Sequence, residues 1–333
     1  MHVSAVLQGG RWGPDCLRRC ENTFRFSAGN DWTGAAWLGH DRGMKKPSIA
    51  GRLGRAAFVS SAALAAALLV AVPTVLYAAR EFRVYRSLEA QADVELPPDY
   101  QVPAEFVVGR LMYPSNPSFG FFRFGSGNWL EGGTPWAVDY PRGDRRYAAI
   151  LRRLTRINVR SVEQPVNLDD DEDVYDWPFM MVGLPGMWEL TDEQVTKLRE
   201  YLLRGGFLLC DSFFGSREWE GFVEGMRRVF PDRPIVDLAP DHPVFHTVYD
   251  LDPRTSQVPN WNALQGGVPY RADGAVPHWR AIVDDTGRVM VMIAFNNDMG
   301  DSWQWADDPD YPQAGAKLGM QMGVNFAVYA LTH

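Results

Sequence analysis

The sequence predicts an α/β domain with a mostly parallel sheet and helices on both faces, preceded by one apolar segment long enough to cross a membrane. Residues 178–184 (PFMMVGL) and 207–210 (FLLC) are short apolar runs bounded by turn residues, as buried parallel strands are. Between them, Thr191 and Gln194 stand at the spacing of a capping box, and Gly205 ends the helical pattern. A strand, a helix and a second strand in this order indicate a parallel crossover.

The other elements follow from the same two periodicities. Alternating apolar residues predict strands at 105–113 and 288–295, and helical spacing predicts helices at 144–156, 219–230 and 314–331. Charged residues ending in Pro97 and Pro98 are typical of a linker, so we expect a stalk at 80–103 and one α/β domain over 104–333.

The composition is that of a globular protein and excludes a nucleic-acid binder. The 333 residues are 46 % hydrophobic and 22 % charged, unlike disordered, collagen-like or coiled-coil chains. The formal net charge is −8, and residues 80–333 carry 24 Lys and Arg against 37 Asp and Glu, a net charge of −13. Because binding to phosphates needs a basic surface, we expect no nucleic-acid partner.

The segment 56–79 predicts an anchor in the inner membrane. It contains 24 residues without a charge, which as a helix would extend about 36 Å against a hydrocarbon core of about 30 Å. The basic residues before it, Lys45, Lys46, Arg52 and Arg55, place its N-terminal side in the cytoplasm. We therefore expect a single-pass protein whose C-terminal domain faces the periplasm or the exterior. The alternative is secretion after signal cleavage, although Leu76 or Tyr77 would then occupy the −3 position, where small residues are preferred.

The remaining N-terminal residues divide into two parts. Residues 1–43 show no sustained periodicity, and Met44 followed by two lysines resembles a natural start, so we interpret 1–43 as a doubtful extension and 44–79 as the basic flank and anchor. The exported part then contains only Cys210, which excludes an internal disulfide there. Its place in an apolar run predicts a buried, inert thiol.

The first candidate site is the turn after the strand at 207–210. In doubly wound sheets ligands bind at the carboxyl ends of the strands, where Asp211 and Ser212 lie. Ser212 occupies a strand-to-helix turn that can expose a nucleophile, but the surrounding residues are not G-x-S-x-G. Asp211 could instead simply cap the following helix. Both residues are weak catalytic candidates.

A second candidate site follows the strand at 288–295. Amides, carboxylates and indoles occur together there, and such groups can bind a sugar through hydrogen bonds and ring stacking. Carboxylates also serve as acid and base in glycoside hydrolysis, which makes Asp298 and Asp301 catalytic candidates as well. The alternative is a polar loop with tryptophans docked on the core. The candidate ligand-binding residues are Asn296, Asn297, Asp298, Asp301, Trp303 and Trp305.

A third loop carries Trp136, Asp139 and Tyr140 ahead of the helix at 144–156, whose first residue, Asp144, could cap it. Because a parallel sheet brings successive strand ends to one edge, we expect this loop to join the other two in one cleft. We expect Asp298 to face solvent in that cleft, so that Asp298→Ala would abolish binding without changing the melting temperature.

Metal binding is considered at two further places. His242 and His246, with Asp241, offer imidazole and carboxylate ligands, but Pro243 breaks any helix that would align them. The acidic run at 169–173 lacks the ligand spacing of a calcium loop and is interpreted as a solvated loop. We predict no cofactor, with a divalent metal at the histidines as the alternative.

Several strings in this order resemble the bacterial family of exported proteins known as domain of unknown function 4159. They are Trp136, 139–141 (DYP), Asp144, 190–193 (LTDE), 202–209 (LLRGGFLL), Asp211, 229–231 (VFP), 241–243 (DHP), Phe245, His246, 296–298 (NND), Gly300, Asp301, Trp303, Trp305 and 329–333 (YALTH). The resemblance covers residues 104–333 and implies a flavodoxin-like fold similar to class I glutamine amidotransferases. It also implies that Asp211 lies near the nucleophile elbow of those enzymes. Relatives read Asp-Asp-Phe-His-Gly at 211–215, whereas this chain has Ser212 and Phe214.

The sequence therefore favours an uncharacterised, membrane-anchored, outward-facing domain that binds a small polar or carbohydrate-like ligand, or an envelope protein, through a degenerate amidotransferase-like cleft. We do not expect a working glutamine amidotransferase. One alternative is an envelope hydrolase that acts on a glycan or an amide through its Asp and His residues, with Asp211, Asp298 and Asp301 as acid, base or metal ligands. The other is a structural subunit of an envelope complex.

Overall fold

The computed structural model describes residues 82–89, 94–116, 127–170, 174–254 and 257–333, all within one compact unit, Glu81–His333. Seven strands form one sheet in the order β2-β1-β3-β4-β7-β6-β5. The strands are β1 (Gly109–Met112), β2 (Gln164–Asn167), β3 (Phe179–Gly183), β4 (Phe207–Asp211), β5 (Val236–Asp237), β6 (His278–Val283) and β7 (Val289–Phe295). The first five strands in this order are parallel, whereas β6 and β5 are each antiparallel to their neighbour. The prediction of a mixed α/β fold with a mostly parallel sheet is thus confirmed.

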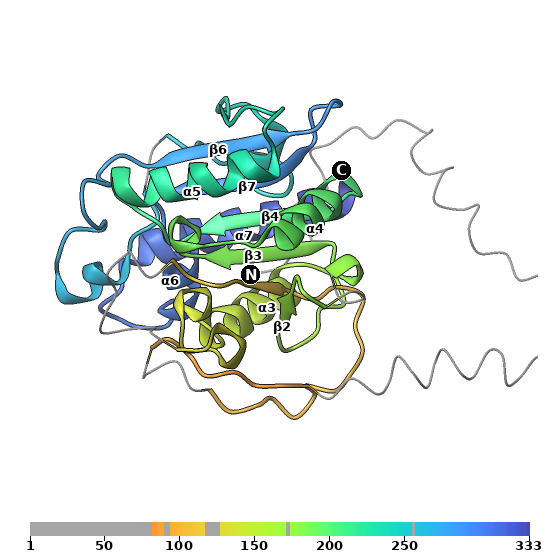
Figure 1. Ribbon diagram of the computed structural model, residues 1–333. Helices are drawn as coiled ribbons and strands as arrows, with labels where there is room; N and C mark the ends of the chain where they lie inside the picture. The colour runs from red at the N-terminus through yellow and green to blue at the C-terminus, as the bar shows by residue number, and fades with distance from the viewer. Residues whose placement is uncertain (1–81, 90–93, 117–126, 171–173, 255–256) are drawn as a thin grey trace, which may run out of the picture. The chain divides into compact units, whose positions relative to one another are not determined.

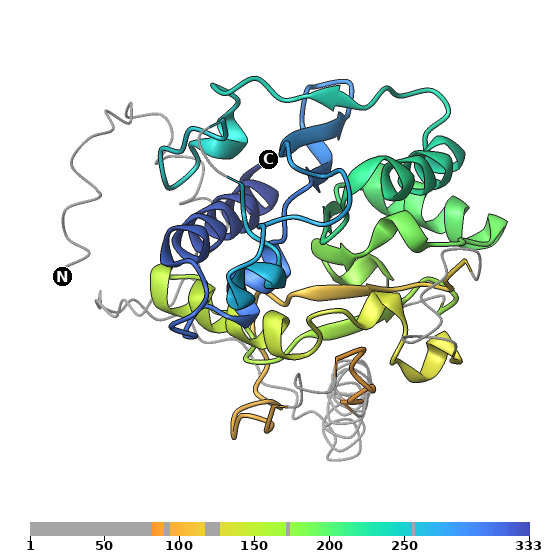
Figure 2. The same cartoon turned by 90° about the vertical axis from the view of Figure 1, so that its left-hand side faces the viewer.

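Among the described residues, five α-helices cover both faces of the sheet (Figure 1). They are α3 (Arg142–Leu154), α4 (Asp192–Leu203), α5 (Gly215–Val229), α6 (Met299–Gln304) and α7 (Gln313–Thr332). Helices α4 and α5 pack on one face, and α3, α6 and α7 pack on the other (Figures 1 and 2).

The central strands are buried on both faces, which explains their continuous apolar sequences. In β3, Met180 and Val182 contact the core under α4 and α5, whereas Phe179 and Met181 point to the opposite core. All five residues of β3, and all five of β4, are buried. The alternation of side chains along each strand thus builds two cores from one apolar run.

Two helices test the capping residues predicted at their N-termini. Helix α4 begins with the predicted capping box, in which Thr191 Oγ1 accepts a hydrogen bond from the Gln194 backbone N–H at 3.2 Å and Gln194 Oε1 accepts one from the Thr191 N–H at 3.1 Å. Helix α3 differs from the expectation, because it begins at Arg142 and Asp144 caps nothing. The Asp144 carboxylate instead receives two hydrogen bonds from the buried Arg110 guanidinium, at 3.0 and 2.9 Å.

The described residues of the segment predicted as a stalk contact the α/β domain. Leu88 N–H donates to the Ala137 carbonyl at 3.0 Å, Arg86 forms a bridge with Gly132, and the Tyr85 ring lies 5.6 Å from that of Trp136. None of the helices among the described residues is long and apolar enough to span a membrane. The predicted anchor at 56–79 lies outside the described residues.

Candidate functional site

Three loops meet at the carboxyl edge of the parallel strands. The first precedes α3 and carries Asp139, the second follows β4 with Asp211 and Ser212, and the third follows β7 with Asp298. Strand β2 lies on one side of β1, and β3 lies on the other side, so the strand order reverses at β1. This edge therefore also contains the topological switch point where ligands bind in such folds. The three loops thus share one edge, as the strand order predicts.

The carboxylates of Asp139, Asp211 and Asp298, here called the acid cluster, lie together although they are far apart in the sequence. One oxygen from each lies within 4.8 Å of the other two, and all three residues are buried. Ser212 Oγ contacts all three, at 2.7 Å from Asp298 Oδ1, 3.1 Å from Asp139 Oδ2 and 3.3 Å from Asp211 Oδ2.

One hydroxyl cannot satisfy three carboxylates. Ser212 has one proton to donate, so the other two contacts to its oxygen need a proton on the carboxyl groups. Burial and the nearby Asp298 charge raise the pKa of Asp211 to about 7, although backbone hydrogen bonds oppose the shift. Burial also raises the pKa of Asp139 well above its ordinary value. Burial therefore favours the protonated forms of Asp211 and Asp139.

The backbone is strained at each loop of the site. Asp139, Ser212 and Asn296 have φ angles of 60°, 59° and 60°, in the left-handed region that residues other than glycine rarely adopt. Such conformations cost of order 1–3 kcal/mol each and concentrate at functional sites. Ser212 does lie on the strand-to-helix turn expected from the sequence, between β4 and α5, but its hydroxyl points into the acid cluster and is buried.

Helix α6 begins on the acid cluster. Asp211 accepts hydrogen bonds from the first two N–H groups of the helix, Met299 N at 2.8 Å and Gly300 N at 2.7 Å. Asp298 caps the same helix by accepting from Asp301 N at 3.1 Å. A Cβ on Gly300 would lie 2.1 Å from Asp139 Oδ2, so only glycine permits this close approach.

The expectation that Asp298 faces solvent is wrong. Its carboxylate is buried, caps α6, accepts from Ser212, and accepts from Asn260 Nδ2 at 2.9 Å. Replacing it with alanine removes a helix cap and leaves donors unpaired, so Asp298→Ala should lower the melting temperature rather than leave it unchanged.

Asp301 connects the acid cluster to the surface. Its Oδ2 accepts from Trp261 N at 2.6 Å and from Asn260 Nδ2 at 3.2 Å, and its Oδ1 accepts from Trp305 Nε1 at 3.1 Å. Trp261 is 44 % exposed, and the Arg142 guanidinium lies 4.6 Å from the centre of the Trp305 ring. Trp261, Trp305 and Arg142 therefore form a rim beside the acid cluster.

Most other predicted ligand-binding side chains have protein partners. Asn296 Oδ1 accepts from Gly215 N at 2.9 Å, and Asn297 Oδ1 accepts from Val258 N at 2.9 Å. The Trp303 ring stacks on Tyr147 at 4.0 Å, Trp136 donates to the Trp129 carbonyl, and Tyr140 Oη accepts from Tyr85 N. Trp136, Tyr140 and Trp303 are fully buried, so they support the loops from the core.

The sequence missed three residues of the site. Asn260 and Arg110 lie on separate segments, and no motif links either one to the acid cluster. Glu89, from the predicted stalk, accepts from Gln304 Nε2 at 2.9 Å and from the Asp139 backbone N–H. Only the tertiary fold brings these residues to the site, so spacing along the chain contains no signal for them.

The predicted histidine site lies apart from the acid cluster. His242 Nδ1 accepts from Val244 N at 3.2 Å. The His246 ring lies 2.5 Å from Asp250 Oδ1 and 2.8 Å from the Pro240 carbonyl oxygen. Within the described ranges, the acid cluster forms the one group of three His, Cys, Asp or Glu residues close enough to share a metal ion, and it includes neither histidine.

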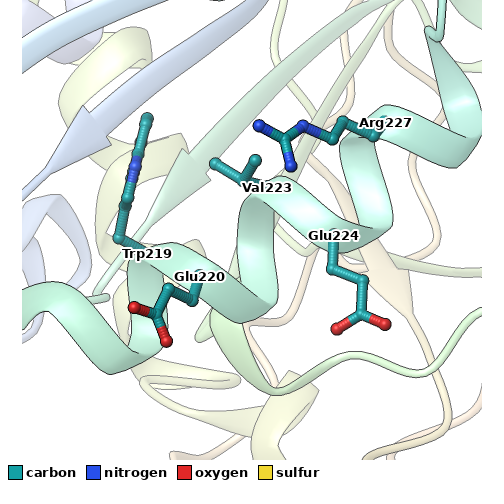
Figure 3. Close-up of a pocket in the computed structure, with 5 residues that line it drawn as sticks. All are labelled: Trp219, Glu220, Val223, Glu224 and Arg227. Carbon is teal, nitrogen blue, oxygen red and sulfur yellow. The ribbon is translucent and has the colours of Figure 1, made fainter.

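A separate hollow of about 520 Å³ lies on the outer side of α5 (Figure 3). It is lined by one face of this helix and contains no residue of the acid cluster. Its lining residues are Trp219, Glu220, Val223, Glu224 and Arg227.

Comparison with known sequences identifies the family. No curated protein matches the chain. The family described as Domain of unknown function (DUF4159) matches residues 127–331, which is more than half of the chain and includes the whole acid cluster. The loops that form the site thus belong to the part of the sequence that defines the family, and this chain is a member of the DUF4159 family.

Proposed function

We propose that this protein is a membrane-anchored, outward-facing domain that binds a small polar or carbohydrate-like ligand at the carboxyl edge of its sheet. The observation that carries the proposal is the acid cluster, in which three loops from separate β/α units bring carboxylates to one point. Each loop also contains one residue with a left-handed backbone: Asp139, Ser212 or Asn296. Stored strain and buried charge reduce stability, and folds retain them where a site needs them.

The rim supports a polar ligand with hydroxyl groups. Trp261 offers an exposed indole, and Trp305 and Arg142 lie beside Asp301, which hydrogen-bonds to both tryptophans. An aromatic face next to charged hydrogen-bonding groups suits a sugar, whose rings have apolar faces and polar edges.

The amidotransferase-like fold is part of the proposal. The parallel strands follow the order β2-β1-β3-β4-β7, which is the flavodoxin-like order. The thiol on β4, Cys210, is buried, and burial raises its pKa well above the ordinary value, so it is a poor nucleophile. These features support a degenerate cleft that binds without amidotransferase chemistry. In this proposal residues 56–79 anchor the domain, and an envelope protein is the alternative partner.

One observation favours a second function, an envelope hydrolase of a glycan or amide. Ser212 Oγ lies 2.7 Å from Asp298 Oδ1, and Asn260 holds the other oxygen of this carboxylate at 2.9 Å. A nucleophile, a base and a group that orients the base form the pattern of covalent catalysis.

The test is a thermal-unfolding screen of the full chain in detergent against sugars and small amides. A ligand that binds only the folded state should raise the melting temperature. Trp261→Ala should reduce the shift, whereas Leu203→Ala, on an equally exposed residue (47 %) at the end of α4, should not. If no compound shifts the transition, ligand binding is rejected. Product release that Ser212→Ala abolishes would favour the hydrolase.

A further inference from the structure

We propose that the acid cluster is a binding site for a hard divalent cation of the Ca²⁺ or Mg²⁺ class, held by Asp139, Asp211 and Asp298. This inference deepens the proposed function, because it assigns an inorganic ligand to the floor of the proposed binding edge. It places the metal at carboxylates, and not at His242 and His246, which lie in a different part of the fold.

The first support is the geometry of the oxygen atoms. One oxygen of each carboxylate lies within 4.8 Å of the other two, so no two are farther apart than two Ca–O bonds of about 2.4 Å. Ser212 Oγ adds a fourth oxygen within 3.3 Å of every carboxylate. A site with only oxygen donors favours Ca²⁺, Mg²⁺ or Mn²⁺ over Zn²⁺ or copper.

The second support is the balance of charge. Two cations lie at this edge, and each already has an acidic partner. Arg110 gives two hydrogen bonds to Asp144, and Arg271, which donates to the Ser212 carbonyl at 2.8 Å, is paired with Glu218. Asp301 adds a further buried carboxylate beside the acid cluster. Buried carboxylates without a counter-charge are costly, and a divalent cation supplies two positive charges at the point where they meet.

The third and independent support is an unpaired buried donor. Arg110 is fully buried, and its Nη1 has no hydrogen-bond partner. This nitrogen lies 3.2 Å from the position of a Cβ on Gly183, which pairs with Asp211 in the sheet. A side-chain carbon of Val138, next to Asp139, lies 2.3 Å from the same position. Arg110 Nη1 therefore faces the acid cluster, away from Asp144.

A buried N–H without an acceptor indicates that an oxygen-bearing ligand belongs beside it. No oxygen of the acid cluster lies within hydrogen-bond distance of Arg110 Nη1, so an acceptor can arrive with the ligand. Hard cations keep water molecules in their coordination shell, and such a water can accept from Arg110 Nη1. The orphan donor and the carboxylates are thus explained by one ligand, a hydrated cation.

The test is titration of the full chain, stripped with a chelator, with CaCl₂, MgCl₂ or MnCl₂ alone. Calorimetry should show saturable binding of at least one ion. At a free concentration 100 times the dissociation constant, the melting temperature should rise by about 5–10 °C. Asp211→Asn and Asp298→Asn should each weaken binding at least about tenfold, because each removes one charged ligand.

Asp307→Asn is the matched control. This carboxylate lies just beyond α6 but is 81 % exposed and outside the acid cluster, so its removal should leave the affinity unchanged. If one of the Asn variants fails to fold, Asp139→Asn and Ser212→Ala test the same site. The titration of the wild-type chain tests cation binding without any variant.

Two results would overturn the cation site: no binding of any of the three ions, or binding that the acid-cluster variants leave unchanged. The proposed function can be rejected independently of the cation site. Metal binding with no response to sugars or amides would reject the polar ligand and retain the cation site, whereas the reverse result would retain only the polar ligand.

Discussion

The ion pair of Arg110 and Asp144 is the residue-scale feature that underlies the functional edge. Both side chains are completely buried, and the guanidinium gives two hydrogen bonds to the carboxylate, at 3.0 and 2.9 Å. A buried pair contributes little compared with apolar residues, but removing one partner leaves the other charge unpaired. The pair therefore restricts which substitutions β1 and α3 tolerate.

We expect Asp144→Asn to lower the free energy of unfolding by about 3–5 kcal/mol, because it leaves the buried Arg110 guanidinium without the charged partner of its two hydrogen bonds. Urea unfolding of the two chains measures the difference. The double variant Arg110→Met, Asp144→Leu should recover most of the loss, since neither charge remains. A double variant as unstable as Asp144→Asn would show that the pair does more than balance charge.

At this scale the sequence predicts positions better than environments. Asp139, Asp211 and Asp298 could be placed at one edge because each adjoins an element of a parallel sheet. Their burial could not be predicted, since it depends on partners such as Asn260 and Arg110 that come from distant segments. Whether a polar residue faces water is decided by tertiary contacts that no local pattern records.

At the scale of elements, strong local patterns identify those strands and helices that are buried or capped. The apolar runs of β3, β4 and β7 and the capping box of α4 lie where the sequence predicts them. Two of the missed elements lack such patterns. Strand β2 (QPVN) lies at the edge of the sheet and contains proline, and α6 has six residues whose first turn is held by Asp211 and Asp298 from outside the helix.

Helix α5 provides a prediction in which packing opposes helix propensity. Alanine usually stabilises a helix interior relative to glycine by about 0.5–1 kcal/mol. At Gly225, however, a Cβ would lie 2.2 Å from Trp188 Nε1, so Gly225→Ala should destabilise the fold by about 1–3 kcal/mol. Thermal unfolding tests this. Combining it with Trp188→Phe, which removes the clashing nitrogen, should cost less than the sum of the two changes.

The turn between β6 and β7 provides a pH-dependent prediction. Burial raises the pKa of Asp284, but hydrogen bonds from Thr286 and Arg288 outweigh it and lower this pKa to about 2. Because the folded value lies below the ordinary value of 3.8, Asp284 contributes stability above about pH 4 and loses it as the pH falls towards 2. Asp284→Asn keeps the Oδ1 acceptor, so its loss of stability should be largest at pH 7 and small near pH 2. Urea midpoints at both pH values measure this, and an equal loss at both would contradict it.

At the scale of the whole molecule, two parts of the chain have opposite charge patterns. The segment 44–55 is basic and precedes an uncharged stretch, whereas residues 80–333 have a net charge of −13. The positive-inside rule keeps the basic flank in the cytoplasm, which directs the domain after the uncharged stretch outward. The candidate site would then be in contact with the periplasm or exterior, where polar envelope ligands occur.

We therefore expect a reporter fused after His333, which is exposed at the end of α7, to be exported. An alkaline phosphatase fusion should be active, and a green fluorescent protein fusion exported in the unfolded state should be dark. Removing residues 44–79 should reverse both results, which controls for the fusion itself. The active fusion should also stay in the membrane fraction after an alkaline wash, because an uncleaved helix of this length spans the bilayer. A fusion that works only in the cytoplasm would reject export, and an active fusion in the soluble fraction would replace the anchor with a cleaved signal.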